Sequence, residues 1–178
     1  MKTPFLILID GPMGSGKTTT SKLLNQKLPD TARVALPDAK RLVPDFREYP
    51  ETLRIIREVM LVMIDKYLEN GVSVIIEQIT KSEGAHLLKG TAEKHGGAFY
   101  GFRLTANKEL RWNRVRERTR QMMEVDSLSQ AKTDELFGYF EPNDLFYNEN
   151  PIEVSETIAT DHLEPEQVAD LIISKLST

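Results

Sequence analysis

The sequence predicts a three-layer α/β/α domain around a five-stranded parallel sheet, and three observations lead to this prediction. Short apolar runs alternate with segments of helical periodicity along the whole chain. A glycine-rich turn joins the first run to the first helical segment. Polar side chains, several of them acidic, stand where the runs end. Strands that alternate with helices are joined by crossover connections, which give a parallel sheet with helices on both faces.

The first half of the chain supplies two strands and two helices. Residues 5–9 are an unbroken apolar run, which predicts a buried strand. Residues 17–28 carry leucines on one face and are followed by a Pro-Asp pair, so they predict a helix and its end. Residues 33–36 are a short strand candidate closed by a proline, and 38–43 predict one helical turn at most. From 50 to 70 apolar side chains recur at helical spacing before a glycine, which predicts a long helix.

The second half repeats the alternation. The apolar run at residues 72–76 predicts a buried strand, and the helical pattern at 82–95 stops at two glycines. Residues 98–104 predict a fourth strand. An arginine-rich helix is predicted at 107–123 and a shorter one at 133–140.

Two elements close the chain. Residues 152–154 are a weak candidate for the fifth strand, and 164–176 predict a helix with proline near its first turn. The length is that of one domain, so we expect residues 1–178 to form a single domain.

Composition limits the possible functions. Hydrophobic residues make up 40% and charged residues 28% of the chain, as in ordinary globular proteins. A formal net charge of −4 argues against general nucleic-acid binding, although it permits a local basic site. Without cysteine there is no disulfide, thiolate metal site or cysteine nucleophile. The first apolar run is too short for a signal peptide or membrane span, so we expect a cytoplasmic protein with no membrane partner.

The turn after the first strand matches G-x-x-x-x-G-K-[ST], the P-loop or Walker A pattern, which predicts a P-loop NTPase fold. Its glycines allow close backbone approach, its amides form an anion-binding nest, and the following helix adds the positive end of its dipole. Lys17 can reach the β- and γ-phosphates of ATP, and the Thr18 hydroxyl can bind Mg²⁺. The residues expected to bind ATP are Gly11, Pro12, Met13, Gly14, Ser15, Gly16, Lys17, Thr18 and Thr19.

Acidic residues follow the second and third strands, at the sheet edge where the P-loop lies. Asp38 is positioned to accept a proton from an acceptor hydroxyl, or to serve only as a helix cap. Arg41 is positioned to clamp an anionic acceptor, or to be an ordinary surface arginine. Glu77 ends an apolar strand as a Walker B residue does, so it is expected to hold Mg²⁺ or to bind the acceptor. Which of Asp38 and Glu77 activates the acceptor stays open.

Three arginines of the 107–123 segment, Arg111, Arg114 and Arg118, share one side of the predicted helix. A cationic face of this kind can stabilise the charge that develops on a phosphoryl group during transfer. We expect Arg114 and Arg118 to be catalytic, together with Lys17 and Asp38.

With these residues in place, the chain resembles the small P-loop kinases of the nucleoside-monophosphate-kinase-like group. It is most similar to the branch that holds polynucleotide 5′-kinase domains, zeta-toxin kinases and chloramphenicol phosphotransferase. The resemblance covers nearly the whole chain and includes Asp-x-x-Arg after the second strand. The lid pattern of that branch is matched by Leu104, Ala106, Leu110, Arg114 and Arg118.

The resemblance implies roles for particular residues. Asp38 takes the place of the acceptor-activating base, and Arg41 that of the basic residue after it. A short helical lid is implied at about residues 107–130, and adenine is implied to lie at the Thr160-Asp161 loop. Glu77 departs from the branch, where many relatives have aspartate.

The leading hypothesis is an ATP- and Mg²⁺-dependent kinase that phosphorylates a hydroxyl, or a phosphate, of a small molecule or nucleotide. A nucleic-acid end stays open as an acceptor, as do the choice between ATP and GTP and the oligomeric state. The alternatives are a P-loop ATPase that drives a partner protein and a non-catalytic nucleotide-binding module.

Overall fold

Five strands form one parallel sheet in the computed structural model, which describes residues 3–43, 50–78, 80–153 and 155–176. The order of the strands across the sheet is β2-β3-β1-β4-β5, and every neighbouring pair is parallel. The strands are β1 (Phe5–Asp10), β2 (Thr31–Ala35), β3 (Ser73–Glu77), β4 (Ala98–Thr105) and β5 (Ser155–Ala159).

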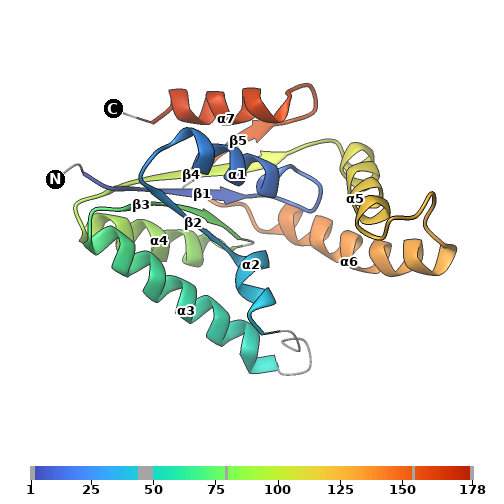
Figure 1. Cartoon of the computed structure of the whole chain (residues 1–178), viewed down its shortest axis with the longest axis horizontal. Helices are drawn as coiled ribbons and strands as arrows, with labels where there is room; N and C mark the ends of the chain where they lie inside the picture. Colours follow the sequence, from blue (N-terminus) through green and yellow to red (C-terminus); the bar gives the residue numbers. More distant parts are fainter. Residues whose placement is uncertain (1–2, 44–49, 79, 154, 177–178) are drawn as a thin grey trace.

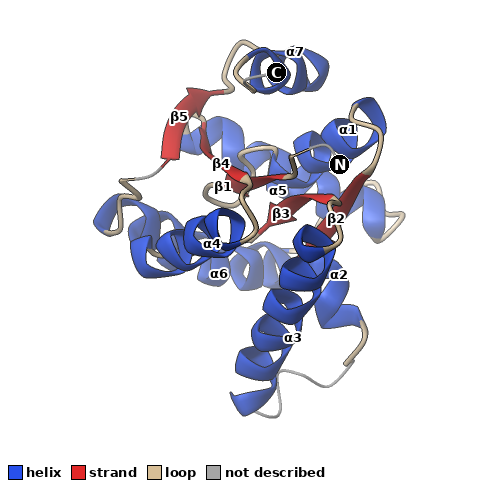
Figure 2. Ribbon diagram, turned by 90° about the vertical axis from the view of Figure 1, so that its left-hand side faces the viewer, coloured by secondary structure: helices blue, strands red, loops and turns tan. Residues whose placement is uncertain are grey.

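Helices cover both faces of this sheet, so the predicted three-layer fold is confirmed. Helices α1 (Lys17–Lys27) and α7 (Pro165–Ser174) lie together on one face (Figure 1). Helices α3 (Pro50–Glu69) and α4 (Ser82–Lys94) lie on the other. Figure 2 shows the sheet between the two layers.

Alternation along β1 builds the two halves of the core. Leu6 and Leu8 are fully buried against α3 and α4, whereas Ile7 and Ile9 are fully buried against α1 and α7. A central parallel strand is expected to be apolar on both sides for this reason.

Three further helices lie near the carboxyl ends of the strands. They are α2 (Leu36–Arg41), α5 (Lys108–Met122) and α6 (Gln130–Glu149). Helices α5 and α6 project together from the sheet in the direction in which β1 points (Figure 1). Within the described part of the chain, no helix has the length and apolar character that a bilayer-spanning segment requires.

Two of the predicted elements differ clearly from the structure, one in length and one in position. The short helix expected at 133–140 is the long helix α6, which continues through Pro142. Proline normally interrupts a helix, but the residues after it make tertiary contacts that hold the last turns in place, as described below.

The fifth strand is Ser155–Ala159 and not residues 152–154. It pairs with Gly101–Thr105 at the end of β4. Ile152 is instead buried in the core beside α3 and α4, and Val154 lies outside the described residues. Among the β5 side chains whose burial the structure describes, 156–159, only Ile158 is buried, so this edge strand gives little hydrophobic signal in the sequence.

The packing of α3 yields a stability test. Ile64 is 0% exposed and Val62 is 68% exposed on the same helix. We expect Ile64→Ala to lower the free energy of unfolding by about 2–5 kcal/mol, because it removes buried methyl groups and leaves a cavity. Val62→Ala should change it by no more than about 0.5 kcal/mol. Urea unfolding measures both values, and equal effects would show that the two faces of α3 are wrongly assigned.

Candidate active site

The loop between β1 and α1 brings three glycines into backbone conformations that other residues rarely adopt. Gly11, Gly14 and Gly16 have φ of 144°, 78° and 98°. An ideal Cβ at Gly14 would also lie 2.3 Å from the carbonyl oxygen of Arg111. Glycine is therefore needed both for the turn and for its closeness to α5. Because α1 begins directly after it, at Lys17, the free N–H groups of the helix favour an anion at this loop.

The ammonium group of Lys17 is enclosed by the loop that precedes it. Its Nζ donates to the carbonyl oxygen of Gly11 at 2.6 Å and to that of Pro12 at 3.0 Å. Withdrawal from water lowers the pKa of Lys17 to about 8, although the carboxylates of Asp10 and Glu77 act in the opposite direction. A phosphate group beside Nζ would stabilise its charged form.

Thr18 and Glu77, the predicted magnesium ligands, are in direct contact. Thr18 Oγ1 donates to Glu77 Oε1 at 2.5 Å, and Ser21 Oγ donates to Oε2 at 2.9 Å. Mg²⁺ at phosphate sites takes one or two protein oxygens beside phosphate and water, and this pair fits that requirement. In the described ranges, no group of three acidic or histidine side chains could hold a metal by itself.

Arg33 is a site residue that was missed from the sequence. It lies on β2 and its side chain is only 12% exposed. Its guanidinium bonds to Ser21 Oγ at 2.9 Å, to Asp38 Oδ2 at 2.5 Å and to Glu77 Oε2 at 2.7 Å. The sequence signal was an arginine inside a short strand. Its partner Glu77 depends on the pairing of β2 with β3, which the sequence does not reveal.

Asp38 lies in α2, as the proximity of strand ends predicted, with its carboxylate held by two arginines. Arg33 takes one oxygen, and Arg41 donates to the other at 3.0 Å. The Arg41 side chain is 76% exposed, so this second pair is a weak surface contact. Neither Asp38 nor Arg41 is among the residues that line the cavity described next, although their neighbours Pro37 and Lys40 are. The guanidinium of Arg33 links Asp38 to Glu77.

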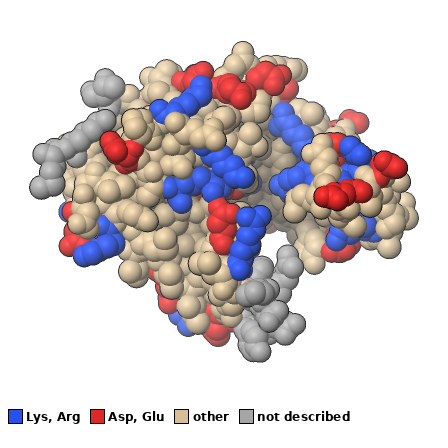
Figure 3. All heavy atoms as spheres, viewed as in Figure 1, with Lys and Arg blue, Asp and Glu red and all other residues tan. Residues whose placement is uncertain are grey.

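A cavity of about 900 Å³ opens along the phosphate loop. Figure 3 shows blue, cationic side chains on both sides of the hollow between the body of the protein and the projecting α5 and α6. The cavity continues past Glu77 and Gln78 to Leu36, Pro37 and Lys40. Its other lining residues come from the phosphate loop with α1, from α5, and from the segment 160–168.

The three arginines of α5 share a face, as predicted, but differ in their contacts. Arg111 is buried and bonds to the carboxylate of Asp144 and to the backbone oxygen of Ala106. Arg114 lines the cavity and bonds to the carbonyl oxygen of Thr160 at 3.1 Å. Arg118 also lines the cavity, and its charge contributes to the low pKa of Lys17. Arg114 and Arg118 therefore both face the cavity, whereas Arg111 is held by Asp144 and also bonds to the carbonyl oxygen of Met13 in the phosphate loop.

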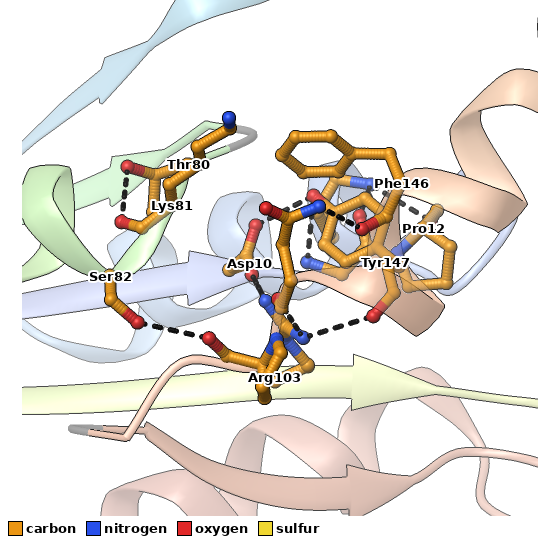
Figure 4. Close-up of polar contacts among 12 residues, drawn as sticks. Asp10, Pro12, Thr80, Lys81, Ser82, Arg103, Phe146 and Tyr147 are labelled. Carbon is orange, nitrogen blue, oxygen red and sulfur yellow. Dashed lines mark hydrogen bonds and ion pairs between the residues drawn. The ribbon is translucent and has the colours of Figure 1, made fainter.

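Helix α6 bonds to the phosphate loop and to the end of β1, and the sequence did not reveal these contacts. Figure 4 shows Asp10, Arg103 and Tyr147 pointing toward one another from β1, β4 and α6. Arg103 pairs with Asp10 Oδ2 at 3.0 Å, and the Tyr147 hydroxyl donates to Oδ1 at 2.6 Å. Burial, with the Asp10 charge, raises the pKa of Tyr147 above its usual range, so this hydroxyl stays protonated. Asn143 Oδ1 accepts from the Met13 amide at 2.6 Å.

These contacts explain why α6 continues through Pro142. Asn143, Asp144 and Tyr147 all follow the proline, and each bonds to the phosphate loop, to β1 or to α5. Trp112 packs against the rings of Phe137 and Phe140, so it contributes to the packing between α5 and α6.

Comparison with known proteins agrees with this geometry. A protein-family model described as "AAA domain" matches residues 7–137, which include the phosphate loop, Asp38, Glu77 and α5. Among curated proteins, none matches the chain in sequence.

Solved structures share the fold over nearly the whole chain. A Chloroflexus aurantiacus j-10-fl protein, provisionally described as a kinase, aligns with a TM-score of 0.69 and 16% identity, covering 99% of this chain and 100% of its own. The tunicamycin resistance protein of Deinococcus radiodurans gives 0.57 and 18%, covering 96% and 94%. Shikimate kinase from Acinetobacter baumannii gives 0.57 and 19%, covering 99% and 97%. The predicted resemblance to small P-loop kinases is confirmed at the level of the fold.

The low pKa of Lys17 predicts a pH-dependent affinity for nucleotides. A bound triphosphate favours the ammonium form, so the complex holds more protons than the free protein above pH 8. Affinity must then fall as the pH rises. We expect the dissociation constant of the magnesium complex of AMP-PNP to increase about tenfold between pH 7 and pH 9. Calorimetry measures it, and Lys17→Arg, which stays charged, should show a flatter profile. An equally flat profile in the unchanged protein would contradict the assignment.

Proposed function

Because the chain belongs to the AAA domain family and carries a complete phosphate-binding loop, we propose that it is an ATP-dependent kinase. It transfers the γ-phosphoryl group of ATP to a hydroxyl, or to a phosphate, of a small-molecule or nucleotide acceptor. The observation that carries this proposal is the lining of the cavity, which extends beyond the phosphate loop to Leu36, Pro37 and Lys40 of α2. At about 900 Å³ it is near the upper limit for a site that binds one small ligand.

The residues around the loop divide the binding of ATP. Lys17 and the loop amides bind the β- and γ-phosphates, and the adenine lies toward the Thr160-Asp161 segment. Thr18 and Glu77 would hold Mg²⁺, and the bound ion would supply positive charge that neutralises the phosphates. Residues 107–130, approximately, close over the site as a lid. Arg114 and Arg118 in this lid then neutralise charge on the γ-phosphoryl group during its transfer.

The acceptor binds near Asp38. In the transfer, the acceptor oxygen forms a bond to the γ-phosphorus while the bond from that phosphorus to the bridging oxygen breaks, which releases ADP. The acceptor proton passes to the carboxylate of Asp38. Although both oxygens of Asp38 are held by arginines, each keeps further lone-pair capacity for a hydroxyl.

Two other functions make different demands. An ATPase that drives a partner protein would release ADP only with that protein, and a non-catalytic module would bind ATP without turnover. The extension of the cavity toward α2 favours a small acceptor over both, since neither alternative needs space beyond the γ-phosphate.

The first test is ADP release in the presence of nucleosides, nucleotides, RNA with a free 5′-hydroxyl, sugars, and aminoglycoside- or phenicol-type compounds. We expect at least one class to stimulate release. Lys17→Ala should lower the stimulated rate at least about 100-fold, since it removes the charge that faces the phosphates. The matched control is Lys27→Ala at the far end of α1, where the lysine pairs with Asp170 on the surface. Full activity of Lys17→Ala, or no stimulation by any class, would refute the kinase assignment.

The second test concerns the base. Asp38→Asn should lower phosphoryl transfer by about 10²- to 10⁴-fold, because an amide cannot take the acceptor proton. Affinity for ATP should stay within threefold, since Asp38 does not contact the phosphate loop. Asp170→Asn, which alters a surface ion pair on α7, should leave the transfer rate unchanged. If Asp38→Asn transfers phosphoryl groups at the normal rate, Asp38 is not the base and has only a structural role in α2.

A further inference from the structure

One side chain connects the two parts of the site that must act together. Arg33 uses all three of its guanidinium nitrogens, and each bonds to a different residue. These three residues lie on α1, α2 and β3. Two of them are Asp38 and Glu77, the carboxylates assigned above to the acceptor and to magnesium.

We propose that Arg33 is a positioning residue for phosphoryl transfer: it fixes the Asp38 carboxylate relative to the Glu77 carboxylate, and so aligns the acceptor with the phosphate groups held by the loop. This inference rests on the proposed kinase function and adds to it Arg33, which is not among the residues that line the cavity.

The geometry favours positioning over charge neutralisation alone. A single positive charge beside Glu77 would be enough to compensate the buried carboxylate. The planar guanidinium does more, because it holds Oε2 of Glu77 at 2.7 Å and Oδ2 of Asp38 at 2.5 Å through two different nitrogens. The fork of donors in arginine is rigid, so the separation of the two carboxylates is fixed with it.

The third contact prevents the guanidinium from rotating. Nε of Arg33 donates to Ser21 Oγ, whose own hydrogen goes to Glu77. Ser21 is 0% exposed on α1, the helix that also carries Lys17 and Thr18. Through Arg33 and Ser21, the position of Asp38 is therefore fixed relative to α1, the helix proposed to bind the phosphates.

The main test is Arg33→Lys, which keeps one positive charge but has a single nitrogen. Lysine can compensate Glu77, so the variant should fold, but it cannot hold both carboxylates in a fixed fork. With Mg²⁺-ATP and either water or any stimulating compound as acceptor, we expect ADP release to fall about 100-fold, the effect of misplacing a reacting group by about 1 Å. The dissociation constant of AMP-PNP without Mg²⁺ should stay within threefold.

A second readout does not depend on turnover. Because Arg33 orients Glu77, the tightening of AMP-PNP binding by Mg²⁺ should be about tenfold smaller in Arg33→Lys than in the unchanged protein. If Arg33 only stabilised the fold, its replacement would lower the melting temperature without changing the ratio of the AMP-PNP dissociation constants without and with Mg²⁺.

A double-mutant cycle shows whether Arg33 acts through Asp38. In the Asp38→Asn background and at saturating Mg²⁺, which compensates the effect on Glu77, Arg33→Lys should change ADP release by less than about threefold, because the Asp38 carboxylate that it positions is already absent. If the loss of ADP release in the double variant equals the product of the losses in Arg33→Lys and Asp38→Asn, the proposal is overturned. An Arg33→Lys protein that keeps more than a third of the normal rate would also overturn it.

Controls separate this inference from the function on which it rests. Arg54→Lys is matched in chemistry, since Arg54 bonds to Glu51 and Glu58 on the exposed side of α3, and it should leave ADP release unchanged. If Arg33→Lys does not fold, Ser21→Ala replaces it and should lower release about tenfold, and an unchanged rate there would count against the proposal. If no compound stimulates ADP release by the unchanged protein, the kinase function fails; if a compound does and only the Arg33 effects are absent, this inference fails alone.

Discussion

The structure depends on keeping two carboxylates buried at the ends of neighbouring strands. Asp10 ends β1 and Glu77 ends β3, and they are 0% and 2% exposed. Each is paired with an arginine from the strand on its outer side, Arg103 on β4 for Asp10 and Arg33 on β2 for Glu77. Charges withdrawn from water persist in a fold only when they are paired and hydrogen-bonded. The strand order β2-β3-β1-β4 supplies both arginines at the sheet edge that carries the phosphate loop.

The same two carboxylates also maintain the charge of Lys17. Burial alone favours a neutral amine, and the negative charges of Asp10 and Glu77 oppose it. Loss of either ion pair would therefore affect the loop twice, because it would leave a buried charge uncompensated and would alter the field around the lysine. The stability of the sheet edge and the chemistry of the loop are thus properties of one set of charges.

This dependence explains which parts of the site the sequence could reveal. The phosphate loop was predictable because Gly11 to Thr18 are adjacent and their spacing determines the turn. Arg33 and Tyr147 were not, since their partners are distant: 44 residues separate Arg33 from Glu77, and 137 separate Tyr147 from Asp10. Strand periodicity shows that a residue lies in a sheet, but not which strand is beside it. Pro142 added a misleading local signal, which tertiary contacts of α6 override.

Arg111, Arg114 and Arg118 show how one helical face can divide its roles along the axis. Arg111 is fixed to Asp144 of α6, and breaking such a buried pair is costly, about 3–5 kcal/mol. Arg118 lies roughly 10 Å further along the helix at 1.5 Å per residue, where no comparable pair holds it in the described structure. A closing lid that preserved the Arg111 pair would have to bend beyond that residue or carry α6 with it. Because α6 is itself bonded to the phosphate loop, bending of the distal part of α5 disturbs fewer buried contacts.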